Sequence, residues 1–394
     1  MSESESSEAP AAGKDRILLI GRRNGAIGAA RRCGWKPVVI DVQPRREQAP
    51  GAFGGTRKLA VEEAMERFSK CPPIAVAAVA TGSVMAAAAI RNRFGIPGLA
   101  IETAKRCHDK LVMKKAIAAA GICCAPWVET NETTTAEELI EKLGLPVVMK
   151  MPISSGGRGV WVCSTEAELR EHLRAGWLAE GFVEGVEMSV ETFRANGSTV
   201  FRNHTRYLKP CWANVVPAAL PDEVAAKVDE LAERVHAALE IDTGISHMEI
   251  FLGKDGPVFG EIAARPPGGY LMELMARAYD FDPWEALLRL AAGESYSFPN
   301  RAKRFAGCWI IHPGTGTVRK IEGLEEARAL TGVADITCKL QPGEKISHRV
   351  GSGQSKGRIV VVAEDGDACA EFLMDALGTI RITMDDGNAE LCQP

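Results

Sequence analysis

Two glutamates on neighbouring segments of the chain could together bind a divalent metal ion. Glu249 lies in the segment GISHMEIFLG, and Glu261 lies in PVFGEIAARPPGG. Paired carboxylates at an open site, completed by phosphate oxygens, are how proteins hold Mg²⁺ for phosphoryl transfer. Like charges placed opposite one another destabilise a sheet unless a cation lies between them. The pair therefore predicts a metal site, provided that both side chains point to the same face of one sheet.

A predicted hairpin would place the two carboxylates on one face. Residues 245–252 and 258–263 are predicted strands, and the glycine-bearing loop 253–257 has a length that closes antiparallel hairpins. If Leu252 pairs with Val258, the two glutamates lie directly opposite each other, with Cβ atoms about 5 Å apart. A register slipped by one residue would instead place the carboxylates in water on a solvated edge. The register therefore decides between a metal site and an ordinary surface.

An arginine and two glycines follow the second glutamate. Arg265 comes four residues after it, and Gly268 and Gly269 open a segment whose composition favours helices. Free N–H groups at a helix start attract anions, and the guanidinium fork suits a carboxylate or a phosphate. The alternative is that the glycines serve only the turn and that Arg265 pairs with Asp280 or Asp282.

A second group of residues with phosphate-binding chemistry lies upstream. The segment LPVVMKM, residues 145–151, is a predicted buried strand that carries Lys150, and a glycine-rich turn follows it. Glycines let the backbone fold over a polyphosphate and offer N–H donors, while the lysine supplies a point charge. An ordinary hairpin would use the same residues, and no Gly-Lys-Ser/Thr follows as in a Walker loop. The positions of the turn that could contact phosphate are Ser155, Gly156, Gly157 and Gly159.

The segment LAEGFVEGVEMSVETF predicts a short strand, a break at Gly185 and another strand. Edge backbone atoms of Glu180 and Val183 could present an acceptor and a donor to a flat heteroaromatic ring. Glu187 could then accept hydrogen bonds from ribose hydroxyls. Spacing alone fits an acidic strand–turn–strand equally well.

Taken in order, these segments resemble the ATP-grasp superfamily, and within it the carboxylate–amine ligases of the L-amino-acid-ligase type. The match begins at Asp109-Lys110, which opens a helix, ends at the loop after Glu261 and covers roughly half of the chain. The resemblance implies a Rossmann-like α/β N-terminal domain, an ATP-grasp fold of two α+β subdomains and a small α+β C-terminal domain.

The resemblance also assigns roles to residues. It implies that Lys110 and Lys150 bind ATP phosphates, that Glu187 binds ribose, and that Glu249 and Glu261 bind Mg²⁺ or Mn²⁺. The other nucleotide contacts that it implies are Ser155, Gly156, Gly157 and Gly159 in a lid, and Glu180, Phe182 and Val183 in the adenine hinge. The catalytic residues that it implies, which hold the carboxylate and the tetrahedral intermediate, are Arg265, Gly268 and Gly269.

One position departs from the superfamily pattern. Many members carry a metal-binding asparagine two residues after the second glutamate, where this chain has Ala263. The nearest polar candidates by sequence for a substitute ligand are Asn203, His204 and Asn214. Some amino-acid-ligase branches are similar in having a small residue there.

The function that the resemblance implies is ATP-dependent ligation of a carboxylate, expected to be that of an amino acid, to an amine. The carboxylate would attack ATP to give an acylphosphate and ADP, and the amine would then displace phosphate. The first alternative is a carboxylase or purine-pathway ligase that activates bicarbonate or a small carboxylate. The second is a nucleotide-binding regulator without turnover. We expect substrate specificity to come from the irregular segment 202–219, notably Arg206 and Trp212.

Composition limits the partners of the protein. The 394 residues carry 47 basic and 51 acidic side chains, so no net basic charge favours nucleic acid. The alanine-rich stretch 74–90 is interrupted by Thr81-Gly82-Ser83 and is predicted as a strand and a helix, not a membrane span. Eleven cysteines without CxxC spacing favour a reducing cytoplasmic location. The expected partners are small-molecule carboxylates and amines, neither nucleic acid nor membrane, with a homodimer as a compatible assembly.

The predicted domain boundaries follow from these segments. The polar, acidic residues 1–15 are predicted to form a disordered tail. Residues 16–104 form the predicted Rossmann-like domain, 105–298 the ATP-grasp domain with a lid subdomain at about 120–182, and 299–394 the C-terminal α+β domain.

Overall fold

The computed structural model describes residues 15–41, 53–80, 82–349, 354–385 and 387–388. The predicted disordered tail, except for its last residue, falls outside these ranges. The chain divides into two compact units. One comprises residues 1–104 and 284–296, and the other comprises residues 105–283 and 297–394.

The first unit is built on a parallel sheet in the order β2–β1–β3. Its strands are β1 (Arg16–Ile20), β2 (Lys36–Ile40) and β3 (Ala75–Ala78), and its helices include α1 (Asn24–Arg32), α2 (Phe53–Arg67), α3 (Ser83–Phe94), the start of α4 (Ile101–Arg106) and most of α10 (Pro283–Ala291). Residues 17–20 are fully buried, as is typical of a central parallel strand. The strand–helix prediction for the alanine-rich stretch is confirmed by β3 and α3. Among the described helices, none is long and apolar enough to cross a membrane.

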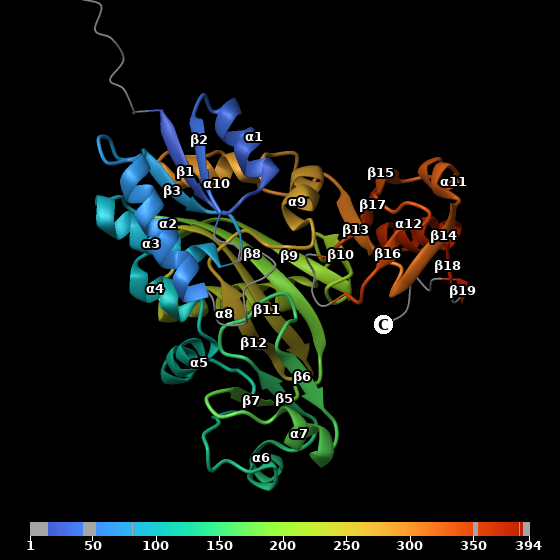
Figure 1. Ribbon diagram of the computed structural model, residues 1–394, viewed down its shortest axis with the longest axis horizontal. Coiled ribbons are helices and arrows are strands. Elements are labelled where there is room, and N and C mark those ends of the chain that lie inside the picture. Colours follow the sequence, from blue (N-terminus) through green and yellow to red (C-terminus); the bar gives the residue numbers. More distant parts are fainter. Residues whose placement is uncertain (1–14, 42–52, 81, 350–353, 386, 389–394) are drawn as a thin grey trace, which may run out of the picture. The chain divides into compact units, whose positions relative to one another are not determined.

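The second unit contains a small antiparallel sheet in the range where the lid subdomain is predicted. Its strand order is β4–β7–β5–β6. The strands are β4 (Trp127–Glu129), β5 (Val147–Lys150), β6 (Val160–Cys163) and β7 (Leu178–Gly181), with helices α6 (Ala136–Leu143) and α7 (Glu166–His172). Both helices lie beside this sheet (Figure 1) and begin with capping boxes, at Thr135 and Thr165.

The second unit also contains an eight-stranded sheet in the order β12–β11–β8–β9–β10–β13–β17–β15. Its first five strands are β8 (Val186–Ala195), β9 (Ser198–Lys209), β10 (Ala213–Val216), β11 (Gly244–Gly253) and β12 (Gly256–Ala263). The accompanying helices are α5 (Lys110–Ala119), α8 (Asp222–Leu239) and α9 (Leu271–Tyr279). All of these strands pair antiparallel, so alternate residues along each strand share a face.

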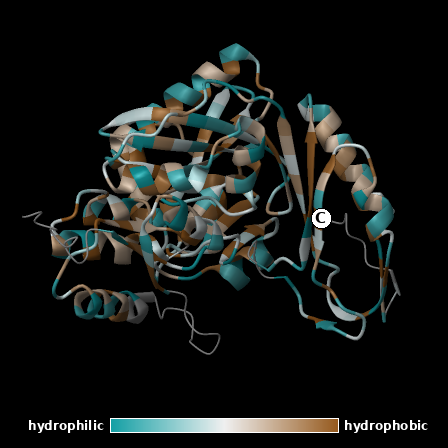
Figure 2. Cartoon of the chain, turned by 90° about the horizontal axis from the view of Figure 1, so that it is seen from above, coloured by the Kyte–Doolittle hydropathy of each residue, from teal (hydrophilic) through white to brown (hydrophobic). Residues whose placement is uncertain are grey.

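The large sheet continues into the C-terminal range. Its last three strands are β13 (Phe305–Ile311), β15 (Val333–Cys338) and β17 (Gly357–Ala363). A separate four-stranded sheet in the order β16–β14–β18–β19 consists of β14 (Gly316–Glu322), β16 (Lys345–Ile346), β18 (Arg381–Met384) and β19 (Gly387–Asn388). The helices of this range are α11 (Leu324–Arg328) and α12 (Gly366–Thr379). Strand β13 pairs antiparallel with β10, so one sheet spans the predicted boundary at residue 298, which stays a prediction. The helices of the chain carry both hydrophobic and hydrophilic residues, as expected for helices that pack on one side (Figure 2). The predicted mixture of α/β and α+β architecture is confirmed.

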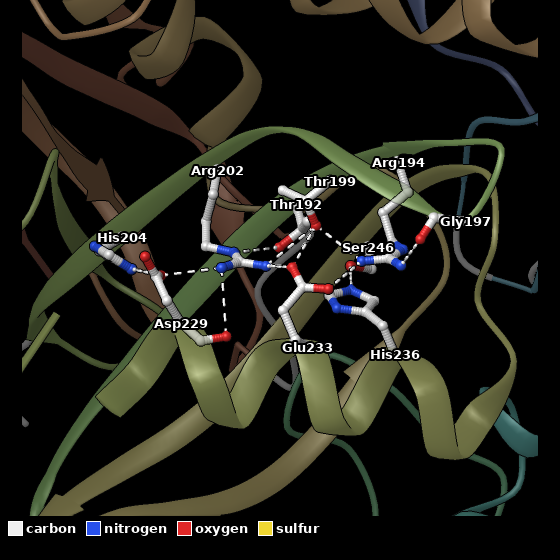
Figure 3. A network of polar contacts seen from close by, with 10 residues as sticks. All are labelled: Thr192, Arg194, Gly197, Thr199, Arg202, His204, Asp229, Glu233, His236 and Ser246. Carbon is white, nitrogen blue, oxygen red and sulfur yellow. Dashed lines mark hydrogen bonds and ion pairs between the residues drawn. The ribbon is translucent and has the colours of Figure 1, made fainter. Parts of the chain in front are cut away.

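Helix α8 covers one face of the large sheet through both apolar and charged contacts. Its buried residues recur at helical spacing: Val228, Leu231, Ala232, Val235, His236 and Leu239. Figure 3 shows the polar contacts, in which Glu233 binds Arg194 and Arg202 of the adjacent strands. His236 lies 2.7 Å from the Ser246 hydroxyl and is 1% exposed. Burial, with help from the nearby arginines, lowers the pKa of His236 to about 3, so the helix is anchored by a neutral imidazole.

This anchor predicts a loss of stability in acid. The ordinary pKa of His236 is 6.5 and its folded value is about 3, so the unfolded chain binds an extra proton between these values and the free energy of unfolding falls as the pH falls. Glu233, with a pKa lowered to about 2, adds to the loss only below its ordinary value of 4.5. As the pH is lowered from about 6.5 to 4.5, the thermal unfolding temperature should therefore fall less steeply for His236→Gln than for the wild type. A matched change at exposed His348, to Gln, should keep the wild-type slope, and equal slopes for all three proteins would contradict the assignment.

Candidate active site

The two glutamates lie opposite each other, but by a different register from the predicted one. Leu252 pairs with Pro257, not with Val258, and a two-residue turn joins the strands because Gly253 pairs with Gly256. A β-bulge then shifts the register by one residue, so Glu249 still faces Glu261. The predicted pairing near the loop is wrong, and the predicted opposition of the carboxylates is confirmed.

The bulge depends on Gly260. A Cβ atom on this residue would lie 2.8 Å from the carbonyl oxygen of Glu249, which is closer than real Cβ contacts allow. Glycine therefore permits the bulge that places the two carboxylates opposite each other.

The surroundings of the carboxylate pair fit a divalent cation. Each side chain is 33% exposed, and Lys110 Nζ lies 3.3 Å from Glu261 Oε2. Burial alone would raise the pKa of Glu249, but His247, Lys150 and Lys110 outweigh it and keep the carboxylate ionised. Hard, ionised oxygen donors of this kind are the ligands that Mg²⁺ prefers. The donor chemistry thus fits the metal, and the metal role of the pair stays a prediction.

The candidates for a third ligand are used elsewhere. Asn203 donates to Glu191 at 2.7 Å, His204 pairs with Asp229 on the face covered by α8, and Asn214 donates to the Gly269 carbonyl. In the described ranges, no three His, Cys, Asp or Glu residues form a metal-binding group. Any metal held by the pair would therefore complete its coordination with water or with oxygens of bound substrates.

Lysines surround a buried glutamate next to the carboxylate pair. Glu180 is 3% exposed, and its two carboxylate oxygens contact different lysines, Lys114 at 2.6 Å and Lys150. Burial opposes the charge on both Glu180 and Lys150, yet their attraction prevails: the pKa of Glu180 is lowered and that of Lys150 is raised. These residues line one narrow space together with Lys110 and Glu261. The structure thus brings both predicted phosphate-binding lysines to the carboxylate pair.

Sequence reasoning missed Lys114. It lies four residues after Lys110 in DKLVMKK, and residues at that spacing share a helix face. That spacing could have placed both lysines on the side of α5 that meets the site.

The predicted adenine hinge begins in a central strand. Glu180 pairs with Trp127 on one side and with Val148 on the other, and the chain leaves the sheet after Gly181. Phe182 donates its backbone N–H to Pro146, and its side chain is half exposed. The hinge role of Glu180, Phe182 and Val183 and the ribose role of Glu187 stay predictions.

The glycine-rich turn joins β5 to β6 as predicted. Gly156, Gly157 and Gly159 have φ values of +65°, +78° and +69°, which favour glycine over residues with a side chain. Ser155 accepts hydrogen bonds from Arg158, and Lys110 Nζ lies 3.3 Å from both oxygens of Ser154. The turn is therefore tied to the helix that carries Lys110.

The loop after β12 has the conformation of a tight helix entry. Arg265 donates to the Pro266 carbonyl at 2.8 Å, and Asp280 pairs with Lys303. Gly269 has a φ of +59°, and a Cβ atom there would lie 2.8 Å from the amide nitrogen of Asn214. Glycine is thus favoured here by the backbone conformation and by the close approach of Asn214, and the anion-binding role of Arg265, Gly268 and Gly269 stays a prediction.

A fully buried acidic residue, also missed from sequence, supports the carboxylate pair. Glu191 is 0% exposed and accepts hydrogen bonds from Ser189, Asn203 and Thr205. His247 Nδ1 lies 2.8 Å from Glu191, and its Nε2 lies 3.5 Å from Glu249. Burial works against the charge on the imidazole, but Glu191 and Glu249 prevail and raise its pKa to about 9. His247 is therefore a cation that bridges two carboxylates.

The predicted specificity segment divides between the two faces of the sheet. Thr205 pairs with Ser189, which in turn pairs with Glu249, so Thr205 lies on the face of the carboxylate pair. The next residue, Arg206, therefore points to the opposite face, where it pairs with Asp367. The register thus places Arg206 on the face away from the carboxylate pair, and its role in substrate specificity stays a prediction. Trp212 lies in the hairpin turn, with the Arg349 guanidinium 4.1 Å from its ring centroid.

Acidic residues near the pair shift the ionisation of their neighbours. Burial and the charge of Glu249 raise the pKa of Glu187 to about 7. Burial, together with Glu249 and Glu191, raises the pKa of Tyr207 well above its ordinary value. The site is therefore a concentrated negative field balanced by a few cations.

Comparisons with known proteins agree with this geometry. Residues 115–273 match the ATP-grasp domain family, and residues 309–385 match the L-amino acid ligase C-terminal domain 2 family. An L-arginine-specific L-amino acid ligase of Bacillus subtilis is 25% identical, over 74% of this chain and 75% of its own length. The uncharacterized protein y4rH of Sinorhizobium fredii is 28% identical, over 91% of this chain and 80% of its own length. A crystal structure of an L-amino acid ligase from Bacillus licheniformis has a TM-score of 0.80 at 22% identity, covering 95% of this chain and 99% of that one, and so shows the same fold.

A change in the carboxylate pair that keeps the side-chain shape tests the metal assignment. Glu261→Gln keeps the shape of the side chain and removes one negative charge, so the gain in ATP affinity on adding Mg²⁺ should fall by about 10- to 100-fold. Titration calorimetry with and without Mg²⁺ measures that gain. Glu322→Gln, on remote β14, is the matched control, and a wild-type response of Glu261→Gln to Mg²⁺ would remove Glu261 from the metal site.

The bulge makes a separate prediction about stability. Gly260→Ala forces a Cβ atom against the Glu249 carbonyl, which should destabilise the protein by about 1–3 kcal/mol. Gly378→Ala, in α12, meets no atom within 4 Å and should not destabilise it. Denaturant unfolding of both variants measures the difference, and an unaffected Gly260→Ala protein would mean that the bulge tolerates a side chain.

Proposed function

This chain is an ATP-grasp ligase related to the L-amino acid ligases, and from that relationship we propose that it joins the carboxylate of an amino acid to an amine. The reaction would form an acylphosphate and ADP, and then an amide and phosphate. The observation that carries the proposal is the convergence of Lys110, Lys150, Glu249 and Glu261 on one site. The match of residues 309–385 to an L-amino acid ligase domain supports an amino-acid substrate.

The lysines would stabilise the charge that moves during phosphoryl transfer. A carboxylate oxygen attacks the γ-phosphorus, the bond to the ADP oxygen breaks, and negative charge spreads over the phosphoryl oxygens. Lys110 and Lys150 lie at the rim of the carboxylate pair, where they would contact these oxygens. Fixed cations in a partly buried site contribute most of what a protein can add to this step.

The carboxylate pair would hold the metal that accompanies ATP. Glu249 and Glu261 would bind Mg²⁺, which neutralises phosphate charge when bound. His247 and Glu191 would keep Glu249 in place, because the imidazole contacts both carboxylates.

The remaining predicted residues would handle the substrate and exclude water. Arg265 and the N–H groups of Gly268 and Gly269 would hold the carboxylate and then the tetrahedral intermediate. The glycine turn 154–159 would close over the phosphates, since an acylphosphate exposed to water hydrolyses unproductively. The cytoplasmic location and a homodimeric assembly remain predictions of the same kind.

Phosphate release tests the reaction class. With Mg²⁺ and ATP, release should require one amino acid or a pair of amino acids, because no acylphosphate forms without a carboxylate. The assay supplies each common amino acid singly and in pairs, with bicarbonate as the control. Release that depends on bicarbonate alone would favour the carboxylase, and ATP binding without release under any condition would favour the regulator.

A further inference from the structure

The buried glutamate beside the phosphate-binding lysine has one more cation than its charge requires. Glu180 Oε1 lies 2.6 Å from Lys114 Nζ, while its Oε2 contacts Lys150. The side chains of Glu180 and Lys114 are each 3% exposed. One carboxylate therefore contacts two ammonium groups inside the protein and can neutralise only one of them. Burying the second positive charge is unfavourable unless another anion pairs with it.

The two lysines differ in their freedom to change partners. The Lys150 side chain is 15% exposed and lies within the field of Glu261 and Glu249, on the side of the predicted metal. Lys114 projects from α5 into the interior, where its Nζ lies 5.4 Å from the centroid of the Phe259 ring. Lys150 can therefore turn toward a bound nucleotide, whereas Lys114 is held at Glu180.

Nucleotide binding sets up a competition for Lys150. The phosphates of ATP and the carboxylate of Glu180 both attract the Lys150 ammonium group. Lys150 is the lysine that β5 supplies to the site, so the two anions compete for it. If Lys150 were the sole partner of Glu180, its departure would leave a buried, unpaired carboxylate, which is strongly unfavourable. With Lys114 in place, Glu180 keeps one partner and Lys150 is released at little cost.

We propose that Lys114 is a positioning residue for nucleotide binding, which stays paired with Glu180 and thereby frees Lys150 to bind the phosphates. The inference rests on the proposed function only in taking Lys150 as a phosphate ligand. It involves an exchange of ion-pair partners, with no bond formed or broken.

The test compares the affinity for MgATP of the wild type and five variants by titration calorimetry, with no amino acid present. Lys114→Met removes the charge at similar length, so Glu180 retains Lys150 and the affinity should fall about tenfold or more. Lys114→Arg keeps the charge and should stay close to the wild type. Adding Glu180→Gln to Lys114→Met removes the competitor for Lys150, so the double variant should bind MgATP more tightly than Lys114→Met alone.

A neighbouring lysine provides the matched control. Lys115 lies on the same helix, is 57% exposed in its side chain and pairs with Glu129. Lys115→Met should leave the MgATP affinity unchanged. Thermal unfolding of each variant shows whether it is folded. If Lys114→Met does not fold, Lys114→Arg is compared with Lys150→Met instead. A folded Lys114→Arg protein that loses as much affinity as Lys150→Met would contradict the inference that Lys114 acts as the counter-ion of Glu180.

Two results for the Lys114→Met protein and its double variant also overturn the inference. One is a folded Lys114→Met protein with wild-type affinity, and the other is a double variant that binds no more tightly than the single one, which would indicate a purely structural role. Because MgATP is titrated without an amino acid, the proposed function can fail separately. If the wild type and the variants bind MgATP as predicted but the wild type makes no amide, the ligase proposal is overturned and the inference stands. A wild type that does not bind MgATP overturns both.

Discussion

The repulsion between two carboxylates held opposite each other on β11 and β12 is the constraint around which the site is built. The strand register fixes Glu249 against Glu261, and neither can turn to the other face without breaking the ladder. Three nearby cations offset this repulsion. Lys110 lies against Glu261, His247 lies against Glu249, and Lys150 is within the field of both glutamates. A site with this balance is prepared to receive a further cation together with an anion that brings its own charge, which is what a metal–nucleotide complex supplies.

The large sheet keeps the chemistry and the anchoring on opposite faces. Alternation along β8 turns Glu191 toward the carboxylate pair and the next residue, Thr192, toward α8. On the site face, Glu191 and His247 form a buried ionic support. On the α8 face, Glu233 ties the arginines of two strands to the helix. The strands that carry the site are thus fixed from both sides, and the exchange of Lys150 between partners takes place at the border with the smaller sheet.

Sequence patterns predicted the parts of the site that depend on local chemistry. The carboxylate pair followed from two strands and a glycine-bearing turn, and the lid turn followed from glycines that adopt positive φ. The bulge at Gly260 could not be predicted, because a single extra residue in a strand leaves no periodic signal and is decided by packing against the Glu249 carbonyl. Glu191 and Lys114 were missed for a related reason: their charged partners, His247 and Glu180, lie far away in sequence, and only the folded chain brings those charges into contact. The prediction that segment 202–219 is irregular was wrong, because residues 202–209 and 213–216 lie in β9 and β10. Without that strand register, the sequence could not indicate that Arg206 takes the face away from the carboxylate pair.

Transfer of oxygen from substrate to phosphate tests the central claim most directly. The protein would be supplied with MgATP, an amine and an amino acid labelled with ¹⁸O in its carboxylate, and the released phosphate would be examined by mass spectrometry. Activation as an acylphosphate predicts that each amide formed is accompanied by one phosphate that carries ¹⁸O from the carboxylate. Amide formation with unlabelled phosphate would contradict the proposed chemistry of the site.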